Sequence, residues 1–269
     1  MSFYRRIACL STEAVETLYA LGAEDCIAGI SGFTVKPARA RAEKPKISGF
    51  SSSRIERILA VQPDLVIGFS NLQADICRDL AKAGVEVHLF NQRSMAGILQ
   101  MVRVMAALVG RHEAGETLVL QLQQQIDAVR ERAAGFESRP RVYFEEWNEP
   151  LMCGIGWVSE AIALAGGIDV FADLACHHDA GRRIIAEPDE VIRRAPDIVL
   201  ASWCGKKFQP DTMRKRPGWD VVPALQHDML FEIKSPDILS PGPSAVTEGL
   251  QQISAIVANW QQRRKGIAS

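Results

Sequence analysis

The longest regular pattern of apolar and polar residues lies in the middle of the chain, from Arg111 to Ala134. Apolar side chains recur there with the spacing of one helix face. They are Ala114, Leu118, Leu122, Ile126, Val129 and Ala133. Gly110 precedes the segment, and Gly135 follows it where we expect a left-handed residue after the last turn. The pattern predicts one helix, about 35 Å long if each residue adds ~1.5 Å.

Shorter apolar runs before this helix alternate with amphipathic segments. The expected strands are residues 6–11, 27–31, 65–69 and 85–90. The expected helices are residues 12–21, 53–61, 74–83 and 94–109, with a loop at residues 32–45. Such alternation is typical of a parallel α/β sheet with helices on its faces.

The same alternation begins again after the long helix. The expected strands are residues 141–147, 198–203 and 230–233, and the expected helices are residues 156–165, 188–194 and 246–260. The polar residues 261–269 are expected to fray. The chain therefore contains α/β sequence on both sides of one long helix.

Two segments on opposite sides of that helix resemble each other. They are IERILAVQPDLVIGFS, residues 55–70, and DEVIRRAPDIVLASW, residues 189–203. Aligning their Pro-Asp pairs also aligns Glu56 with Asp189. Each segment reads as a short helix ended by a proline, followed by a buried strand. We infer an N-terminal lobe at residues 1–110, a connecting helix at 111–135 and a C-terminal lobe at 136–269, with a ligand cleft between the lobes.

Composition and charge exclude several classes of protein. The chain has 269 residues, 47% hydrophobic and 23% charged, which is ordinary usage for a globular protein. A net charge of −1 gives no reason to expect nucleic acid or an anionic membrane as a partner. The N-terminal residues have no secretory leader pattern, so the sequence as written predicts a cytoplasmic protein. A periplasmic location is the alternative if a leader is missing from this sequence.

The cysteines do not predict a disulfide framework or a zinc site. The six are far apart and form no CxxC pair. Cys9 and Cys77 fall in a predicted strand and helix, where cysteine usually serves as a small core residue. The cluster at residues 176–178 lacks the second pair of ligands that a structural zinc site needs.

The ordered set of segments resembles one protein family. The segments are STEAVETLYALGAEDCIAGISG, ISGFSSSRIERILAVQPDLVIG, RDLAKAGVEVHLF and RRAPDIVLASW. They look like the helical-backbone class (class III) of ABC-importer substrate-binding proteins, which includes binders of vitamin B12, haem and siderophores. Residues 203–205, 216–219 and 240–243 look most like the cobalamin-binding branch. The resemblance implies two α/β lobes, each with a mostly parallel sheet flanked by helices, joined by one long helix around a ligand cleft.

The resemblance also implies a ligand and the side chains that contact it. The family places aromatic residues on loops at the carboxyl ends of strands. The matching residues are Phe33, Phe50 and Phe69 in the first lobe, and Trp147, Trp157 and Trp203 in the second. Flat aromatic rings suit a corrin, and core packing is the alternative for each phenylalanine. The implied ligand is cobalamin or another corrinoid, with haem or a ferric siderophore as the alternative, and there is no intrinsic cofactor.

Two acidic residues are implied contacts with a membrane partner. B12-binding members dock on the arginines of a permease dimer through one acid on each lobe. Glu56 and Asp189 stand at the matching positions, and Glu187 and Glu190 are nearby alternatives. The competing interpretation is that these are solvated acids at helix N-termini, where the helix dipole favours negative charge.

Other polar residues permit weaker hypotheses. His177 or His178 is a candidate axial ligand to cobalt or haem iron, or a ligand to a bare metal, in an otherwise polar loop. Glu145 and Glu146 are adjacent in a predicted strand, so they should face opposite sides of the sheet. A catalytic pair of carboxylates is therefore a poor interpretation of these two residues.

An enzyme is the main rival class. The sequence has no GxSxG, no P-loop and no GxGxxG after a strand. A cytosolic corrinoid sensor or carrier without a permease is a further alternative. We predict a non-catalytic, monomeric binding protein for a metal chelate of corrinoid size.

Overall fold

The computed structural model describes residues 4–267, with side chains through residue 264. Its contacts divide the chain into two compact units. Unit 1 holds residues 4–92, 96–123 and 240–243, and unit 2 holds residues 93–95, 124–239 and 244–267. Among the described residues, no helix is long and apolar enough to cross a bilayer. All six cysteines are free thiols, as the absence of a disulfide pattern predicts.

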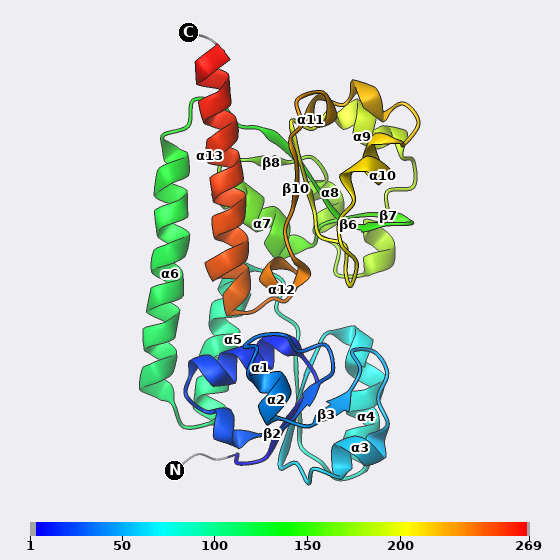
Figure 1. The fold of residues 1–269 in the computed structure, drawn as a ribbon. Helices are drawn as coiled ribbons and strands as arrows, with labels where there is room; N and C mark the ends of the chain where they lie inside the picture. The colour runs from blue at the N-terminus through cyan, green and yellow to red at the C-terminus, as the bar shows by residue number, and fades with distance from the viewer. Residues whose placement is uncertain (1–3, 268–269) are drawn as a thin grey trace. The chain divides into compact units, whose positions relative to one another are not determined.

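Unit 1 is built on a five-stranded sheet in the order β3-β2-β1-β4-β5 (Figure 1). The strands are β1 (Ile7–Cys9), β2 (Ile27–Ser31), β3 (Lys46–Ser48), β4 (Leu65–Phe69) and β5 (Val87–Phe90). Every neighbouring pair is parallel, so the carboxyl ends of all five strands lie at one edge. The sequence did not predict β3, a short edge strand just after the expected loop.

Helices flank this sheet and close its core. They are α1 (Thr12–Ala20), α2 (Ala40–Glu43), α3 (Ile55–Leu59), α4 (Ala74–Lys82) and α5 (Met95–Leu108), with 3-10 turns η1 (Glu24–Cys26) and η2 (Asn71–Gln73). One core cluster joins strand residues to α3 and α4 through Ala8, Leu10, Ile47, Ile58, Val66 and Leu80. The N-cap of α1 is Ser11.

The long helix is α6 (His112–Ala134), which confirms its predicted position. Its buried face holds Leu122, Ile126 and Val129, as predicted, and also Val119. The prediction for Gly135 is wrong: this residue is absent from the positive-φ glycines, whereas Gly110 before the helix has φ +66°. The helix contributes its residues up to 123 to unit 1 and the rest to unit 2.

Unit 2 has a mixed sheet in the order β10-β9-β6-β7, with β8 also paired to β6. The strands are β6 (Arg141–Asn148), β7 (Leu151–Cys153), β8 (Ile168–Asp169), β9 (Ile198–Ala201) and β10 (Leu230–Glu232). Only β7 runs antiparallel among these strands, which confirms the mostly parallel sheet. The short strands β7 and β8 were not predicted.

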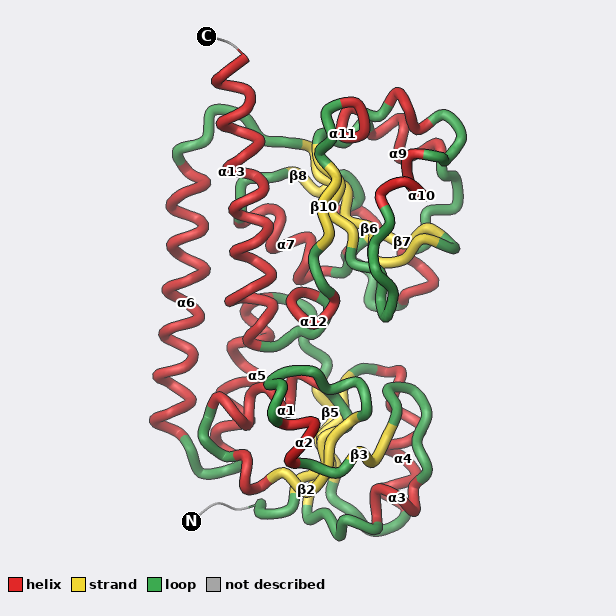
Figure 2. The backbone as a smooth tube through the Cα atoms, viewed as in Figure 1, coloured by secondary structure: helices red, strands yellow, loops and turns green. Residues whose placement is uncertain are grey.

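The helices of unit 2 are mostly short (Figure 2). They are α7 (Gly156–Leu164), α8 (Ala172–Ala175), α9 (Asp189–Arg194), α10 (Pro210–Arg214), α11 (Pro223–Gln226) and α12 (Ser235–Ile238), with 3-10 turns η3 (Ala180–Arg183) and η4 (Trp219–Val221). A π-helical turn, η5 (Ala245–Gly249), leads into α13 (Leu250–Ile267). This helix continues through residues 261–267, which the sequence predicted to fray.

The Pro-Asp pair of unit 1 fastens a strand to the helix before it. The Asp64 carboxylate accepts hydrogen bonds from the backbone N–H groups of Arg5 (2.7 Å) and Arg6 (3.0 Å). The Arg6 side chain in turn donates to the carbonyls of Val61 (2.6 Å) and Gln62 (3.0 Å), just beyond α3. The aspartate therefore binds the chain entering β1, and the arginine binds the end of the helix.

Unit 2 repeats this arrangement. The Asp197 carboxylate accepts from the backbone N–H of Arg141 at 2.8 Å, and Arg141 Nε donates to the carbonyl of Arg194 at 2.8 Å. Asp197 N–H also donates to the Arg141 carbonyl at 2.8 Å. The sequence repeat therefore has a physical basis, because each Pro-Asp pair supplies the same ties between a strand and a helix.

A four-residue strap, Ser240–Pro243, belongs to unit 1 although the chain on both sides of it belongs to unit 2. Gln92 Nε2 donates to the Pro241 carbonyl at 2.8 Å. The hydroxyls of Thr12 and Ser240 share a hydrogen bond of 2.8 Å. A Cβ on Gly242 would lie 2.6 Å from the Cβ of Glu13, so only glycine fits there.

Candidate ligand-binding edges

Three phenylalanines lie at the carboxyl edge of the unit 1 sheet. Phe33 follows β2, Phe50 follows β3 and Phe69 is the last residue of β4. Phe33 is 64% exposed, Phe50 is half-buried and Phe69 is only 6% exposed. The structure thus brings the three residues to one edge, with Phe33 most accessible and Phe69 largely packed in the core.

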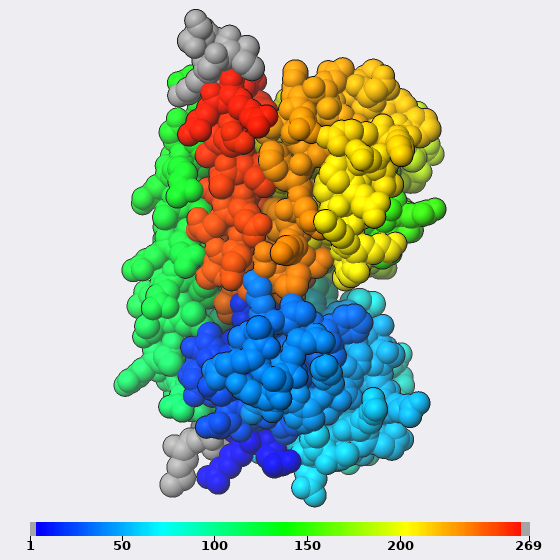
Figure 3. Space-filling view, viewed as in Figure 1, coloured from blue at the N-terminus to red at the C-terminus, as the bar shows by residue number. Residues whose placement is uncertain are grey.

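The loop that carries Phe33 is bonded to the ends of two strands. Phe33 N–H donates to Ser31 Oγ at 3.3 Å, and Thr34 N–H donates to the Ser31 carbonyl at 3.0 Å. Gly32 N–H reaches the Ser48 carbonyl at the end of β3 at 2.8 Å. The segments after β2 and β3 form part of the surface of unit 1, in mid-blue in Figure 3.

The buried Gln73 side chain links three parts of this edge. Its Oε1 accepts from Phe69 N–H at 2.8 Å, and its Nε2 donates to the carbonyls of Leu10 (3.1 Å) and Phe50 (2.8 Å). The side chain is fully buried, so these three bonds satisfy polar groups that water does not reach. The neighbouring Leu72 is 57% exposed, an accessible apolar residue at the same edge. Sequence reasoning missed both residues.

The three tryptophans of unit 2 differ in accessibility. Trp147 is half-buried, and Lys206 Nζ lies 4.2 Å from its ring centroid. Trp157 is 3% exposed and donates its indole N–H to the Ile238 carbonyl at 2.7 Å, which places it in the core. Trp203 is 5% exposed and packs edge-on against Phe208 at 5.2 Å. Trp147 is therefore the most accessible of the predicted contacts in this unit.

Trp203 is held by a buried ion pair. Its indole N–H donates to Glu145 Oε1 at 2.9 Å. Arg216 binds both oxygens of the same carboxylate, at 2.6 Å and 2.9 Å, and the Tyr143 hydroxyl donates to it at 3.0 Å. Burial, followed by the Glu145 charge, raises the pKa of Tyr143 well above its usual value. The fully buried Glu145 carboxylate is thus satisfied by three different side chains.

Glu146 has a separate arginine. Arg183, 3% exposed, donates to the two Glu146 oxygens at 2.6 Å and 3.2 Å and to the Cys153 carbonyl at 2.8 Å. The adjacent carboxylates of Glu145 and Glu146 therefore have different partners and different burial, as strand alternation predicts. Each is paired with its own guanidinium, so the two carboxylates do not act together as an acid–base pair.

The predicted docking acids are exposed at helix starts. Glu56 lies in the first turn of α3, and Asp189 lies in the first turn of α9. Neither carboxylate has a hydrogen-bond or ion-pair partner within residues 4–264. Glu190, an alternative to Asp189, is already paired with Arg193 and Arg194, at 2.5 Å and 2.7 Å. The geometry therefore favours Asp189 over Glu190 as an available acid, while docking itself stays a prediction.

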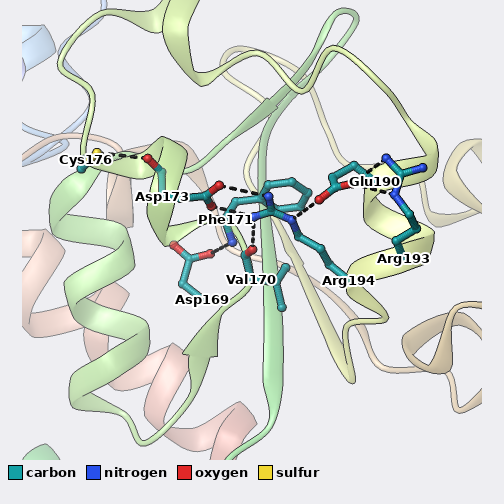
Figure 4. A network of polar contacts seen from close by, with 8 residues as sticks. All are labelled: Asp169, Val170, Phe171, Asp173, Cys176, Glu190, Arg193 and Arg194. Carbon is teal, nitrogen blue, oxygen red and sulfur yellow. Dashed lines mark hydrogen bonds and ion pairs between the residues drawn. The ribbon is translucent and has the colours of Figure 1, made fainter.

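A polar network ties α8 to α9, the helix that begins with Asp189 (Figure 4). Arg194 binds both carboxylate oxygens of Asp173, at 2.6 Å and 3.0 Å, and its Nε binds Glu190. Its guanidinium also lies 4.3 Å from the centroid of the Phe171 ring. Hydrogen bonds from Arg194 hold the pKa of Asp173 and of Glu190 below their usual values. Burial raises the pKa of Asp169 beside them.

The two histidines lie in the chain between α8 and η3. His177 is half-buried and His178 is exposed. In the part of the chain that the structure describes, no three His, Cys, Asp or Glu side chains are grouped to hold a metal ion. A bare-metal site thus gains no support from the geometry. Axial ligation of a chelated metal, which needs only one imidazole, stays a prediction.

A groove of about 450 Å³ lies elsewhere in unit 2. It is lined by Arg130, Ala133, Ala134, Phe136, Arg139, Glu160, Ala163, Leu164 and Gly166. None of the six predicted aromatic contacts lines it, so this groove is distinct from the predicted ligand site.

Comparisons with known proteins agree with this fold. A family model described as periplasmic binding protein matches residues 7–236. The vitamin B12-binding protein of Vibrio campbellii is 23% identical over 94% of this chain and 90% of its own. Among solved structures, a periplasmic haem-binding protein of Roseiflexus sp. RS-1 has a TM-score of 0.81 at 24% identity, covering 94% of this chain and 99% of its own.

A solved periplasmic vitamin B12-binding protein of Vibrio cholerae has a TM-score of 0.77 at 19% identity, covering 96% of this chain and 98% of its own. At these identities, the structural likeness shows the fold alone. The family match covers most of the chain and confirms the resemblance that the sequence predicted. The chain belongs to the periplasmic binding protein family, as a non-catalytic ligand-binding protein of the helical-backbone class.

Proposed function

We propose that this protein binds a corrinoid, such as cobalamin, as the substrate-binding protein of an ABC importer. The observation that carries the proposal is the sequence likeness to a vitamin B12-binding protein across 94% of the chain. In those relatives cobalamin is the ligand named, so we assign it here as cargo and not as an intrinsic cofactor. The cargo would contact aromatic residues at the carboxyl edges of both sheets.

The accessible aromatic residues suit such a cargo. Phe33 is exposed, and Phe50 and Trp147 are half-buried. The backbones of Phe33 and Phe50 are hydrogen-bonded, and the Trp147 indole N–H donates to the Glu149 carbonyl at 2.7 Å. Ring stacking supplies roughly 0.5–1.5 kcal/mol per favourable pair beyond area burial. A corrin offers a large, flat and partly apolar surface to these rings. Phe69, Trp157 and Trp203 are mostly buried, so we expect them to pack in the core of their units and to contribute little direct contact with the ligand.

Ligand titration tests the cargo. Purified protein is titrated with cyanocobalamin, cobinamide, haemin and a ferric hydroxamate, while tryptophan emission and the visible spectrum are recorded. We expect saturable quenching by the two corrinoids. Saturation by haemin or the ferric hydroxamate alone would replace the corrinoid with haem or a siderophore. No saturation by any of them would refute the proposal.

The same titration tests axial ligation. If His177 or His178 binds the metal of the chelate, His177→Ala or His178→Ala should remove the shift of the corrin band or the Soret band. A band shift that survives in both variants would exclude these residues as axial ligands.

The proposed importer role also requires contact with a membrane permease. We propose that Glu56 and Asp189 pair with permease arginines, since both are exposed and have no partner within the described residues. The periplasm would then be the working location, in agreement with the family description and not with the cytoplasmic expectation. A soluble corrinoid carrier without a permease is the alternative.

Binding to the permease in proteoliposomes tests docking. Glu56→Ala combined with Asp189→Ala should abolish capture of the protein and leave its cyanocobalamin affinity unchanged. Glu131→Ala, on the exposed surface of α6, removes an acid elsewhere and is the matched control. Equal capture of the double variant and the control would exclude these acids as the docking contacts.

A further inference from the structure

Phe33 has an exposure that packing does not explain. At 64%, it is the most exposed large hydrophobic residue in the described part of the chain. Burying a phenylalanine side chain contributes roughly 1.5–3 kcal/mol relative to leaving it in water. Phe33 gives up most of that contribution in this fold, and an apolar ligand bound against it would restore it.

An exposed ring on a mobile loop would bind weakly, because binding would have to order the loop. Fixing the backbone of one residue costs roughly 1–2 kcal/mol, and that cost is subtracted from the binding free energy. The N–H groups of Gly32, Phe33 and Thr34 are all hydrogen-bonded to the strand ends. The two carbonyl groups that flank Phe33 have a partner from another part of the chain.

Arg41 is that partner. Its Nη1 donates to the Gly32 carbonyl at 3.3 Å and to the Thr34 carbonyl at 2.9 Å, the two carbonyls that flank Phe33. Arg41 lies on α2, which is anchored by the fully buried Ala40. One charged group thus holds the backbone on both sides of the exposed ring, and charged donors make stronger hydrogen bonds than neutral ones.

The neighbouring Arg39 shows that this use of Arg41 is specific. Arg39 pairs with Glu24 at 2.7 Å and with Glu43 at 3.6 Å, and stacks on the Tyr19 ring at 4.6 Å. Arg41 has no carboxylate partner within the described residues. The two arginines lie two positions apart, yet only Arg41 donates to the Phe33 loop.

We propose that Arg41 is a positioning residue for ligand binding, which holds Phe33 in place against the cargo. The inference rests on the proposed function and names a contribution that acts entirely through Phe33. A rival role is direct contact of the remaining guanidinium N–H groups with an acidic group of the ligand. The two roles differ in whether the effect of Arg41 requires the Phe33 ring.

A double-mutant cycle separates these roles. Cyanocobalamin affinity is measured for the wild type, Arg41→Met, Phe33→Ala and the double variant. We expect Arg41→Met to weaken binding about five- to tenfold, the value of roughly one hydrogen-bonded contact. In the Phe33→Ala background, Arg41→Met should have no further effect. If Arg41→Met weakens binding by the same factor with and without the Phe33 ring, the proposal is overturned, since Arg41 would then act without Phe33.

Hydrogen exchange tests the loop without any ligand. The amides of residues 32–34 should exchange faster in Arg41→Met than in the wild type, and Arg41→Lys should restore much of their protection. Arg39→Met is the matched control and should leave both these amides and the cyanocobalamin affinity unchanged. Unchanged exchange in Arg41→Met would refute the positioning role.

The binding measurements and the hydrogen-exchange measurement test the ligand assignment and the role of Arg41 separately. If the wild type does not bind cyanocobalamin but binds haemin, the cycle is run with haemin, because the corrinoid assignment and not the positioning role has then failed. If no chelate binds, the proposed function fails, and hydrogen exchange alone decides whether Arg41 holds the Phe33 loop.

Discussion

A buried carboxylate is tolerated only when other groups replace its water. Glu145 is fully buried and is bound by Arg216, Trp203 and Tyr143. Taking a carboxylate and a guanidinium out of water costs several kcal/mol each, so the pair adds little net stability. Removing one partner is different, because the remaining charge stays buried without compensation.

Arg216→Met should therefore destabilise the protein by roughly 3–5 kcal/mol. The double variant Glu145→Met/Arg216→Met should recover most of this loss, because it leaves no buried charge. Urea unfolding followed by tryptophan emission measures both free energies of unfolding. A double variant as unstable as Arg216→Met would show that the carboxylate is needed for more than charge pairing.

Sequence reasoning predicted residues that follow strands and missed the side chains that hold them. Phe33, Phe50 and Trp147 stand at the ends of apolar runs, a local signal. Gln73 reaches the Phe50 carbonyl and Arg41 reaches the loop of Phe33. Arg216 reaches Glu145 on β6. All three come from other segments of the chain, and nothing in their neighbouring residues shows where they point. The family resemblance did not supply these roles either. The predicted ligand contacts themselves stay predictions.

At the scale of elements, the long helix was predicted well because its pattern spans six turns. Short elements were not. The strands β3, β7 and β8 have three, three and two residues, too few to display alternation. They form because neighbouring strands offer unpaired backbone groups, which is a property of the assembled sheet. Gly135 ends α6 without the left-handed conformation that a glycine at this position usually signals.

Two glycines, one in α6 and one just after it, should respond differently to alanine. A Cβ on Gly115 would overlap the Cβ of Ala106 on α5, whereas a Cβ on Gly135 would meet only the Arg132 carbonyl, at 3.7 Å. Alanine gains up to ~1 kcal/mol in a helix, but overpacking costs about 1–3 kcal/mol. Gly115→Ala should therefore lower the thermal midpoint, and Gly135→Ala should not.

Calorimetry of the two variants against the wild type checks this prediction. The comparison is matched, since both substitutions add one methyl group to the same helix or its end. A Gly115→Ala variant as stable as the wild type would mean that α5 and α6 can move apart at no cost.

The contact between α8 and α9 should weaken in acid. Arg194 lowers the pKa of Asp173 in the folded state, so the folded protein binds fewer protons than the unfolded chain. The contribution of the Asp173 charge to the free energy of unfolding is fully present above the usual pKa, about 4. It is lost as the pH falls through the lowered folded-state pKa. Burial raises the pKa of Asp169, which gives the opposite slope between its usual and its raised pKa.

Comparing the wild type with Asp173→Asn isolates the contribution of Asp173. The difference in free energy of unfolding between the two should shrink as the pH is lowered from 6 towards about 3, measured by urea unfolding. A difference that stays constant with pH would show that the contact between Arg194 and Asp173 contributes to stability without the charge of Asp173.

For the whole molecule, the ordered α/β alternation and the repeated Pro-Asp pair predicted the class of fold. The family match confirms that class and the prediction that the chain is not an enzyme. The lobe boundaries at residues 110 and 135 and the monomeric state stay predictions. The sequence as written favoured the cytoplasm, whereas the family description supports the periplasmic alternative.

Ligand binding should stabilise the whole molecule. A ligand that binds only the folded state contributes about 2.7 kcal/mol when its concentration is one hundred times Kd. Cyanocobalamin should therefore raise the thermal midpoint with a logarithmic dependence on concentration, followed by calorimetry. An unchanged midpoint at saturating cyanocobalamin would contradict specific binding to the folded protein.

The strap Ser240–Pro243 has a consequence for how the protein is made. Unit 1 is otherwise complete at residue 123, but its bonds from Thr12 and Gln92 need Ser240 and Pro241. During synthesis on the ribosome, unit 1 must wait for nearly all of unit 2 to be translated before these bonds can form. An emerging chain can build the first sheet early, and it acquires the finished first unit only near the end of translation.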